Sequence, residues 1–403
     1  MRYLFLLLVF IGISYGETVQ ELINIANEKN PELQSIQNQL KSYQAKEKFE
    51  GSLDDPVVSI SINDIQLFNQ PFNRTIEPMQ NIMFGFSQKV PYSGKLDLKQ
   101  EIVKKLYDST YYKLKATELK IKRDIYNLSY SIWNIQEKLK IINKYKDIVE
   151  QTIKLSNTLY AVGKSTQGDV LNAQVYYTQL LEKEIFLKHL KEQKLALLKK
   201  VVNAEVKEVS IKPEEPEIIS NLSFLSKKLE EQNPELMSIK KLVEKENTSL
   251  KLAKKDYYPD FKMFFNYAYR QSFYDYISFG VAFNIPLWKK KRQDNKVLEF
   301  NYKKLSVKKQ LENRLNELNG KLEEEFYKCL SSQETYSLFK NLLELQTEKN
   351  FEAVISEYEV GKKNMLDVLN AIKQILAVKL KKIDEIYNFN VSLTNIKELT
   401  GEL

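Results

Sequence analysis

The side chains that most often carry acid–base, nucleophilic or metal chemistry are almost missing from this 403-residue chain. Its one histidine, His189, lies among lysines on a polar stretch, and its one cysteine, Cys329, lies on an apolar helical stripe. The sequence shows no phosphate-binding loop, nucleophile motif or cluster of metal ligands. It therefore predicts neither an enzyme nor a metal or cofactor site. A single cysteine also excludes an intrachain disulfide.

A motif that occurs twice holds the most distinctive residues of the chain. Tyr-Ala-Val-Gly at 160–163 is followed by Asp-Val-Leu-Asn-Ala at 169–173. Tyr-Glu-Val-Gly at 358–361 is followed by the same five residues at 367–371. Each glycine suits the position after a helix where φ is positive, and each aspartate precedes an apolar helical run whose N-terminus it can cap. The motif therefore predicts two helix–turn–helix hairpins with a glycine at each turn.

Other landmarks recur in the same order, about 200 residues apart. Asn-Pro-Glu-Leu at 30–33 returns at 233–236, and the pattern Phe-Gly-x5-Pro occurs at 84–91 and at 279–286. This order predicts a duplicated unit of helix, β-hairpin, long helix and helix. The first repeat is expected at 17–204, a proline-containing linker at 205–217, and the second repeat at 218–403.

Each repeat holds two short runs in which apolar residues alternate with small or polar ones, which is the period of a β-strand. The runs cover residues 58–63, 82–87, 261–269 and 277–285, with Met83 and Phe264 as exceptions on the small or polar face. One apolar face opposite a small or polar face is typical of a membrane β-barrel wall, although a soluble sandwich shares the pattern. Four strands cannot close a barrel, because about eight are the minimum. Two copies would give eight strands with a filled interior, and three would give twelve with a lumen.

Aromatic residues flank these runs where they meet the helices, as they do at a membrane interface. They are Tyr92, Tyr257, Tyr258 and Trp288. Four basic residues at 289–292 follow Trp288, and they suit either contact with anionic lipid head groups or a solvated helix start. Polar segments at 66–80 and 270–276 join the opposite ends of the runs, and we expect them to be exposed loops.

Two helices are too long for an ordinary globular core. Residues 94–160 contain no internal glycine or proline, and apolar residues from Ile121 to Ile142 alternate in steps of four and three, which is a heptad seam. At 1.5 Å per residue such a helix would reach roughly 100 Å. Residues 294–358 repeat the pattern with Gly320 as the only interruption. Each long helix is expected to pair with the antiparallel helix that follows its turn.

The N-terminus predicts export. Arg2 precedes an apolar stretch too short to span a membrane, and small residues end the segment 1–16, as in a signal peptide. No cysteine follows this stretch, so a lipid anchor is not expected. The net charge of +8 is spread along helix faces where lysine alternates with glutamate. This distribution predicts a solvated surface and no nucleic-acid partner.

Together, the duplicated Tyr-x-Val-Gly…Asp-Val-Leu-Asn-Ala segments and the Phe-Gly-x5-Pro runs resemble the outer membrane efflux protein (TolC) family, over nearly the whole chain. The resemblance implies a mainly α-helical fold with membrane β-strands. In it, a homotrimer forms a long periplasmic α-barrel and a shared twelve-stranded β-barrel in outer-membrane lipid. It also implies a periplasmic adaptor protein and an inner-membrane pump as partners, and no cofactor. The adaptor would dock at the periplasmic tip, on Val162, Gly163, Val360 and Gly361.

The resemblance also implies a gate at that tip. Asp367 matches a position that forms an acidic ring, where like charges around a three-fold axis narrow the pore and favour cations. One helical turn further on, where the family often has a second acid, this chain has Asn370, so a weaker constriction is expected. Tyr358 and Lys363 resemble residues that tie the inner hairpin to Asp169 of the outer hairpin in a closed tip. Helix capping is the alternative role of both aspartates.

Other classes of exported protein explain less of the sequence. A general porin would need its whole barrel in one chain, and an adaptor protein would need a glycine-rich lipoyl-like or β-barrel domain. A structural coiled-coil or adhesion protein without a pore would explain the helices but not the four alternating runs. The predicted function is therefore the exit duct of a tripartite efflux or type I secretion system. The sequence does not distinguish a drug, a metal ion or a protein as the substrate.

Overall fold

The computed structural model describes residues 17–65, 67, 78–271 and 273–403, so the predicted signal peptide at 1–16 and most of the predicted loop at 66–80 lie outside it. Helices make up most of the described chain, and the order of elements in the first repeat returns in the second. No helix in the described part of the chain combines the length and apolar character needed to cross a membrane. The elements are β1 (Glu17–Thr18), α1 (Val19–Lys29), α2 (Pro31–Glu50), β2 (Val57–Asn63), β3 (Asn81–Val90), α3 (Lys95–Ala161), α4 (Gln167–Val202), β4 (Val209–Ser210), α5 (Leu222–Gln232), α6 (Pro234–Lys255), β5 (Phe261–Tyr269), β6 (Tyr276–Phe283), α7 (Gln293–Leu338), the π-helix η1 (Phe339–Leu343), α8 (Glu344–Glu359) and α9 (Met365–Leu399).

The chain folds into two compact units, and each unit contains residues of both repeats. We call them the strand unit, which is Ile36–Leu114 with Pro234–Leu315, and the hairpin unit, which is the chain up to Ser35 with Lys115–Asn233 and Asn316–Leu403. The predicted repeats divide the chain along its sequence, whereas these units divide it by packing.

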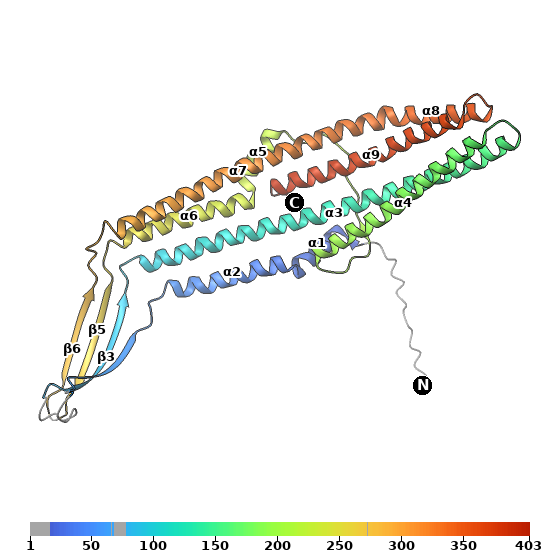
Figure 1. Ribbon diagram of the computed structural model, residues 1–403. Coiled ribbons are helices and arrows are strands. Elements are labelled where there is room, and N and C mark those ends of the chain that lie inside the picture. Colours follow the sequence, from blue (N-terminus) through green and yellow to red (C-terminus); the bar gives the residue numbers. More distant parts are fainter. Residues whose placement is uncertain (1–16, 66, 68–77, 272) are drawn as a thin grey trace, which may run out of the picture. The chain divides into compact units, whose positions relative to one another are not determined.

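The strand unit contains an antiparallel sheet with the strand order β2-β3-β5-β6 (Figure 1). The register pairs Ile60 with Phe84, Phe84 with Tyr267, and Tyr267 with Ile277. Because side chains alternate along each strand, this register places the apolar residues of all four strands on one face. That face is open, and Phe279 at its edge is 87% exposed. The period-two pattern therefore predicted both the strands and their faces.

Phe264, an exception to the alternation, is explained by the glycine beside it. Phe264 pairs with Gly280 across β5 and β6. A Cβ atom at Gly280 would lie 2.4 Å from the Phe264 ring, so only glycine leaves room for the ring there. The aromatic side chain thus covers the glycine on the small and polar face.

Helix α6 contacts the first part of α3 and the first part of α7 within the strand unit. Ser109 of α3 shares a 3.0 Å hydrogen bond with Ser238 of α6, and Lys105 lies 2.7 Å from Glu244. Arg314 of α7 lies 2.8 Å from Glu235 of α6. Polar and charged contacts therefore fix the sequence positions at which these helices meet.

The hairpin unit contains two antiparallel helical hairpins, α3–α4 and α8–α9, whose turns are drawn in green and red in Figure 1. One apolar core joins all four helices and includes Ile142 of α3, Leu180 of α4, Tyr358 of α8 and Ile372 of α9. Ile125 and Ile132, on the predicted heptad seam of α3, are fully buried. Within the described residues the seam therefore packs as the sequence predicted.

The two Asn-Pro-Glu-Leu segments fasten the ends of helices in the hairpin unit. The Asn30 side-chain amide donates a 2.9 Å hydrogen bond to the carbonyl oxygen of Val201 near the end of α4. The Asn233 amide donates a 2.9 Å hydrogen bond to the carbonyl oxygen of Leu399, the last residue of α9. Carbonyl groups in the last turn of a helix lack helical partners, so each asparagine satisfies one of them. We call these two contacts the asparagine clamps.

One element differs from the sequence prediction. Gly320 lies inside α7 without interrupting it, because packing outweighs the roughly 1 kcal/mol that an interior glycine costs a helix. The α-helical pattern is instead interrupted by η1, where no glycine or proline occurs. Directly after η1, Glu344 pairs with Lys379 at 3.0 Å and with Lys382 at 2.6 Å. The long helix predicted at 294–358 is therefore present as α7, η1 and α8, and Gly320, which interrupts the sequence pattern, does not interrupt the helix.

Candidate functional site

The two hairpin turns have the same backbone geometry, set by a glycine with positive φ. Gly163 has a φ of 74° and Gly361 a φ of 77°. The Lys164 N–H donates to the Leu159 carbonyl at 2.8 Å, and the Lys362 N–H donates to the Glu357 carbonyl at 2.8 Å. These bonds satisfy carbonyl groups at the ends of α3 and α8. Both predicted turns are therefore present.

The residue before each of these glycines presents an apolar side chain to solvent. Val162 is 63% exposed and Val360 is 66% exposed. A Cβ atom at Gly163 or Gly361 would meet no other atom within 4 Å. The turns thus form open surfaces, where the predicted docking residues are accessible.

The N-cap residues of the helices that follow the turns are Thr166 and Asn364, and each motif aspartate takes part in the capping from the third helical position. Thr166 and Asp169 exchange hydrogen bonds at the start of α4, with the Asp169 N–H donating to Thr166 Oγ1 at 3.1 Å and the Thr166 N–H donating to Asp169 Oδ2 at 3.0 Å. Asn364 and Asp367 do the same at the start of α9, at 2.9 Å and 3.2 Å. Each pair forms a capping box. Capping is therefore one role of each aspartate.

Asp169 makes further contacts that join the two hairpins. Ser165 Oγ donates to Asp169 Oδ2 at 3.1 Å, and Ser165 Oγ also lies 3.4 Å from the buried hydroxyl of Tyr358 on α8. The backbone N–H of Met365, the first residue of α9, also helps to lower the pKa of the Asp169 carboxyl group. Asp169 on α4 is thus connected through Ser165 to Tyr358 on α8 of the other hairpin. We call this set of contacts the tip link.

The tip link affects the pKa of Asp169. Partial burial alone would raise this pKa, but the hydrogen bonds donated by Thr166, Ser165 and Met365 outweigh burial and lower it below its ordinary value of 3.8. Hydrogen bonds to a carboxylate favour its charged form. Asp169 therefore holds the hairpins together as an anion at neutral pH.

The other predicted gate residues lie close to the tip link. Asp367 is partly exposed, while Asn370 and Lys363 are exposed. Within the described part of the chain, the Lys363 ammonium group makes no hydrogen bond or ion pair. Tyr358 reaches Asp169 through Ser165 rather than directly. The roles of these residues in a gate stay predictions.

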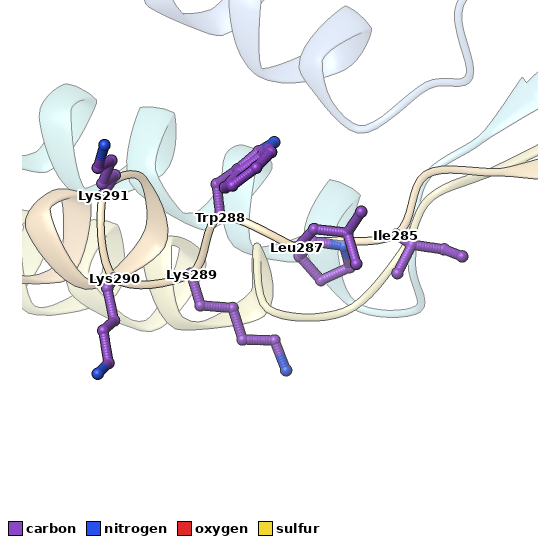
Figure 2. A pocket seen from close by; sticks show the side chains of 7 residues that line it. Ile285, Leu287, Trp288, Lys289, Lys290 and Lys291 are labelled. Carbon is purple, nitrogen blue, oxygen red and sulfur yellow. The ribbon is translucent and has the colours of Figure 1, made fainter.

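The four predicted interfacial aromatics lie where the sheet meets the helices of the strand unit. Tyr92 and Tyr258 stack with their ring centroids 4.5 Å apart, and the Tyr257 hydroxyl donates to Asp294 in the first turn of α7. Trp288 is 74% exposed and borders a surface hollow lined by Ile285–Lys291 (Figure 2). Three of these aromatics thus have fixed neighbours, and Trp288 lies on the surface.

An ion-pair cluster at the same junction was missed by the sequence reasoning. Lys95, at the start of α3, lies 3.1 Å from Asp256 and 2.9 Å from Asp260. Asp260 also accepts a 2.9 Å hydrogen bond from the Tyr92 N–H. Burial alone would lower the pKa of Lys95, but the two carboxylates raise it. The proximity of β3 and β5 in space creates this cluster, and only a correct strand pairing could have revealed it.

Ser165 and Met365 were also missed, although part of the signal was present. Thr166 and Asp169 have the spacing of a capping box, Thr-x-x-Asp, which would have drawn attention to the turn beside them. The contact between Met365 and Asp169 depends on how two hairpins pack, and no local pattern encodes it. In the described residues, no group of three or more histidine, cysteine, aspartate or glutamate side chains could hold a metal ion.

Residues 225–402 of the sequence match the model of a family described as outer membrane efflux protein. None of the curated proteins matches the sequence. The family match covers most of the second repeat, including the second of the two tip motifs.

Solved structures extend the likeness to nearly the whole chain. CusC, whose crystal structures concern folding and transmembrane channel formation, matches with a TM-score of 0.82 and 13% identity over 95% of this chain and 91% of its own. VceC, an outer membrane protein from Vibrio cholerae, matches with a TM-score of 0.80 and 16% identity over 95% and 96%. The CmeC outer membrane channel from Campylobacter jejuni gives 0.76 and 15% over 95% and 85%. Residues 225–402 therefore match the outer membrane efflux protein family in sequence, and the chain shares the fold of these solved channel structures along nearly its whole length.

Proposed function

We propose that this chain is one subunit of a trimeric outer-membrane channel that serves as the exit duct of a tripartite efflux or type I secretion system. The observation that carries the proposal is the four-stranded sheet, which has one exposed apolar face and two open edges, β2 and β6. In lipid, unpaired backbone groups at an open edge cost several kcal/mol each. Other copies of the chain must therefore complete a closed barrel.

The number of strands favours three copies. Three copies would supply 3 × 4 = 12 strands, and a barrel of that size encloses a lumen, whereas eight strands leave an interior filled by side chains. On the small and polar face, Ser59, Gly85, Asn266 and Ser278 lie opposite one another across the four strands, and this face suits a wet lumen. The apolar face then meets outer-membrane lipid, and the helices extend into the periplasm.

The tip geometry supports a gated duct. The tip link connects the outer hairpin α3–α4 to the inner hairpin α8–α9 through Asp169, Ser165 and Tyr358. Breaking the link would free the inner hairpin to move outward. In a trimer, three Asp367 carboxylates around the axis would favour cations and resist close approach, while Asn370 adds polarity without charge.

Exposed apolar side chains at the tip support docking of a partner. Val162 and Val360 are the accessible residues, next to Gly163 and Gly361, whose lack of side chains allows close approach of another backbone. We propose that a periplasmic adaptor protein binds here with a helical hairpin and connects the duct to an inner-membrane pump.

The test is the conductance of the mature protein in a planar lipid bilayer, compared with two variants at one position. Asp367→Asn keeps an oxygen that can accept the hydrogen bond from the Asn364 N–H but removes the charge. Asp367→Ala removes both the charge and the cap. We expect small cation-selective steps from the wild type, lower cation selectivity in both variants, and larger steps in Asp367→Ala.

The outcomes separate the parts of the proposal. If steps occur but neither variant changes their selectivity, the channel stands and Asp367 has no part in the gate. If Asp367→Ala gives larger steps but Asp367→Asn keeps the wild-type cation selectivity, capping and not charge is what matters at this position. Folded, oligomeric protein that gives no steps at all would contradict the channel and favour a structural coiled-coil protein.

A further inference from the structure

Four basic side chains at one edge of the sheet have no acidic partner within the described chain. Lys289, Lys290, Lys291 and Arg292 follow β6, all four are exposed, and none forms an ion pair with another described residue. Figure 2 shows Lys289 and Lys290 on one side of the segment, with Trp288 and Lys291 on the other. Most long charged side chains on the helices of this chain have an opposite charge nearby, as Lys105 has Glu244. The positive charge of the basic run at 289–292 is therefore available to an acidic group outside the described chain.

Two acidic side chains at the opposite edge of the sheet are likewise unpaired within the described residues. Asp54 and Asp55 precede β2, and both are exposed. The strand order is β2-β3-β5-β6 with every neighbouring pair antiparallel. The start of β2 and the end of β6 therefore lie at the same end of the sheet. One sheet thus carries negative charge at one edge and positive charge at the other.

A pairing of basic and acidic side chains at a boundary between two strands already occurs once within the chain. At the boundary between β3 and β5, Lys95 follows the first strand, while Asp256 and Asp260 flank the approach to the second. The Lys95 side chain is only 9% exposed there. The duplicated proline positions relate this boundary to the sheet edges: Pro91 corresponds to Pro286, so Lys95 corresponds to Lys290.

The acidic side corresponds in its place along the chain but not residue by residue, because positions 53 and 57 are Leu53 and Val57. Pro259 corresponds to Pro56, so Asp256 and Asp260 correspond to positions 53 and 57, which flank Asp54 and Asp55. The boundary between β3 and β5 is thus the internal counterpart of a boundary between β6 of one copy and β2 of the next.

We propose that Asp54 and Asp55 of one copy pair with the basic run 289–292 of the neighbouring copy, forming an intersubunit ion-pair collar where the β-barrel meets the helices. The proposal rests on the trimeric channel proposed above. It adds the contact by which adjacent copies recognise each other and the register in which their edge strands meet. The Lys95 cluster is the corresponding set of ion pairs within one copy, at the boundary between β3 and β5.

The duplication also predicts the register between copies. Val90 pairs with Phe261 across β3 and β5. By the same proline positions, Val90 corresponds to Ile285 and Phe261 to Val58, so Ile285 of one copy should pair with Val58 of the next. Phe283 should then pair with Ile60. All four side chains of these two predicted pairs belong to the apolar face. A slip by one residue would turn one strand's apolar side chains into the lumen, so the predicted register is consistent with a continuous lipid-facing wall.

A second copy suits the basic run better than anionic lipid does. Lipid head groups would leave Asp54 and Asp55 unpaired, whereas a second copy neutralises both sets of charges at once. A second copy also provides backbone partners for the open edge of β6. Opposite charges at the two ends of a repeating interface further exclude wrong pairings, such as β6 with β6, because like charges would meet.

Cysteine cross-linking tests the contact directly. The natural Cys329 is fully buried, so introduced cysteines can be oxidised selectively. Asp55→Cys combined with Lys290→Cys is expected to give disulfide-linked dimers and trimers on a denaturing gel. The two single variants, and Asp55→Cys combined with Lys251→Cys on the exposed face of α6, serve as controls. No intersubunit cross-link from trimeric protein would overturn the proposal.

Charge reversal tests the energetics. Changing Lys289, Lys290, Lys291 and Arg292 to glutamate should lower the temperature at which the detergent-purified trimer dissociates. Adding Asp54→Lys and Asp55→Lys should restore most of the loss. If the trimer with both the basic and the acidic residues reversed is no more stable than the trimer with only the basic residues reversed, the proposal is overturned. A second outcome would also overturn the proposal. In it, charge reversal leaves the stability of the trimer unchanged, but native mass spectrometry shows that the variant retains less phosphatidylglycerol relative to phosphatidylcholine than the wild type does. The basic run would then bind lipid and not a second copy.

The trimer itself is measured separately. Wild-type protein that is monomeric by mass and gives no conductance would refute the proposed channel, and the collar with it. Wild-type protein that is trimeric and conducting, but shows neither the cross-link nor rescue by charge reversal, refutes the collar alone.

Discussion

Two aspartates with the same local sequence have different surroundings in this protein. Asp169 and Asp367 both cap a helix after a glycine turn, and both are followed by Val-Leu-Asn-Ala. Of the two, only Asp169 also accepts a hydrogen bond from a serine, Ser165, whose hydroxyl group lies 3.4 Å from Tyr358 of the other hairpin. A shared motif therefore predicts a shared local role, and the further role depends on what packs against it.

Asp169→Asn should loosen the tip at neutral pH. The pKa of Asp169 is lowered in the folded protein, so the stabilisation by its carboxylate is present above its ordinary value of 3.8 and is lost as the pH falls through the lowered value. Hydrogen exchange of the segment after Gly361 should therefore be faster in the variant at pH 7, and the difference should vanish in acid. Asp367→Asn is the matched control, and an equal effect there would contradict a special role for Asp169.

Gly163→Ala and Gly361→Ala should each destabilise the protein by about 1 kcal/mol, because a residue with a Cβ pays this cost at positive φ. No atom lies near enough to clash with the added methyl group, so strain in the backbone is the only cost. Gly320→Ala inside α7 is the control, and it should stabilise the protein slightly, because alanine favours a helix. Chemical denaturation of the three variants measures the difference.

At the residue scale, the sequence predicted what depends on neighbours along the chain. The positive φ of Gly163 and Gly361 and the capping by Asp169 follow from local rules. The contact from Met365 to Asp169 joins residues almost 200 positions apart, and the Lys95 cluster needs β3 beside β5. Neither can be found without the packing of distant elements.

At the scale of the elements, the asparagine clamps are the clearest contacts that hold helix ends together. Asn30 and Asn233 are both buried, and each bridges the end of one helix to the end of another. The two clamps occupy equivalent positions in the two repeats. Each repeat therefore holds the end of its last helix, α4 or α9, at the junction between its first two helices.

Asn233→Ala should cost about 1–3 kcal/mol, because it leaves the Leu399 carbonyl without its partner in a buried place. Asn30→Ala should cost a similar amount at the end of α4. Asn24→Ala on the exposed face of α1 is the control and should stay within about 0.5 kcal/mol of wild type. Urea unfolding provides the comparison, and equal stability of Asn233→Ala and Asn24→Ala would show that the clamp contributes nothing.

Heptad spacing and glycine turns made the long helices predictable to within a few residues. The π-helix η1 was not predictable, because no residue type marks it. Its position depends on which faces the helix turns inward before and after it. Before η1, α7 keeps Leu322 and Cys329 buried. After η1, α8 directs Glu344 and Glu348 toward Lys379 of α9. One inserted residue lets a continuous helix satisfy both requirements.

At the scale of the whole molecule, the proposed channel needs the sheets of several copies. The two edges of the sheet are open and its apolar face is exposed, which no isolated copy can tolerate in lipid. The sequence predicted this need for other copies from the number of strands alone. The pairing of opposite charges between copies could be inferred only once the strand order placed residues 54–55 and 289–292 at the same end of the sheet.

Phe279→Asp should impair insertion into the outer membrane, whereas Ser278→Asp should not. The two residues are adjacent on β6 but lie on opposite faces, Phe279 on the apolar face and Ser278 on the small and polar one. A lysine or arginine at a lipid-facing position near the membrane midplane costs about 2–4 kcal/mol and an aspartate less, while a charge in a wet lumen remains hydrated. Recovery of each variant in the outer-membrane fraction measures the effect, and equal recovery would contradict the assigned faces.

The environment of Cys329 has a practical consequence for following this protein in motion. Burial raises the pKa of its thiol to about 12, so at neutral pH it holds almost no thiolate, which is the form that reacts with maleimides and spin labels. The natural chain therefore serves as its own unreactive background for labelling. A label attached through a cysteine at exposed Val162 or Val360 would be the only one in each copy. Distances between such labels could then report how wide the tip stands, without a substitution in the helical core.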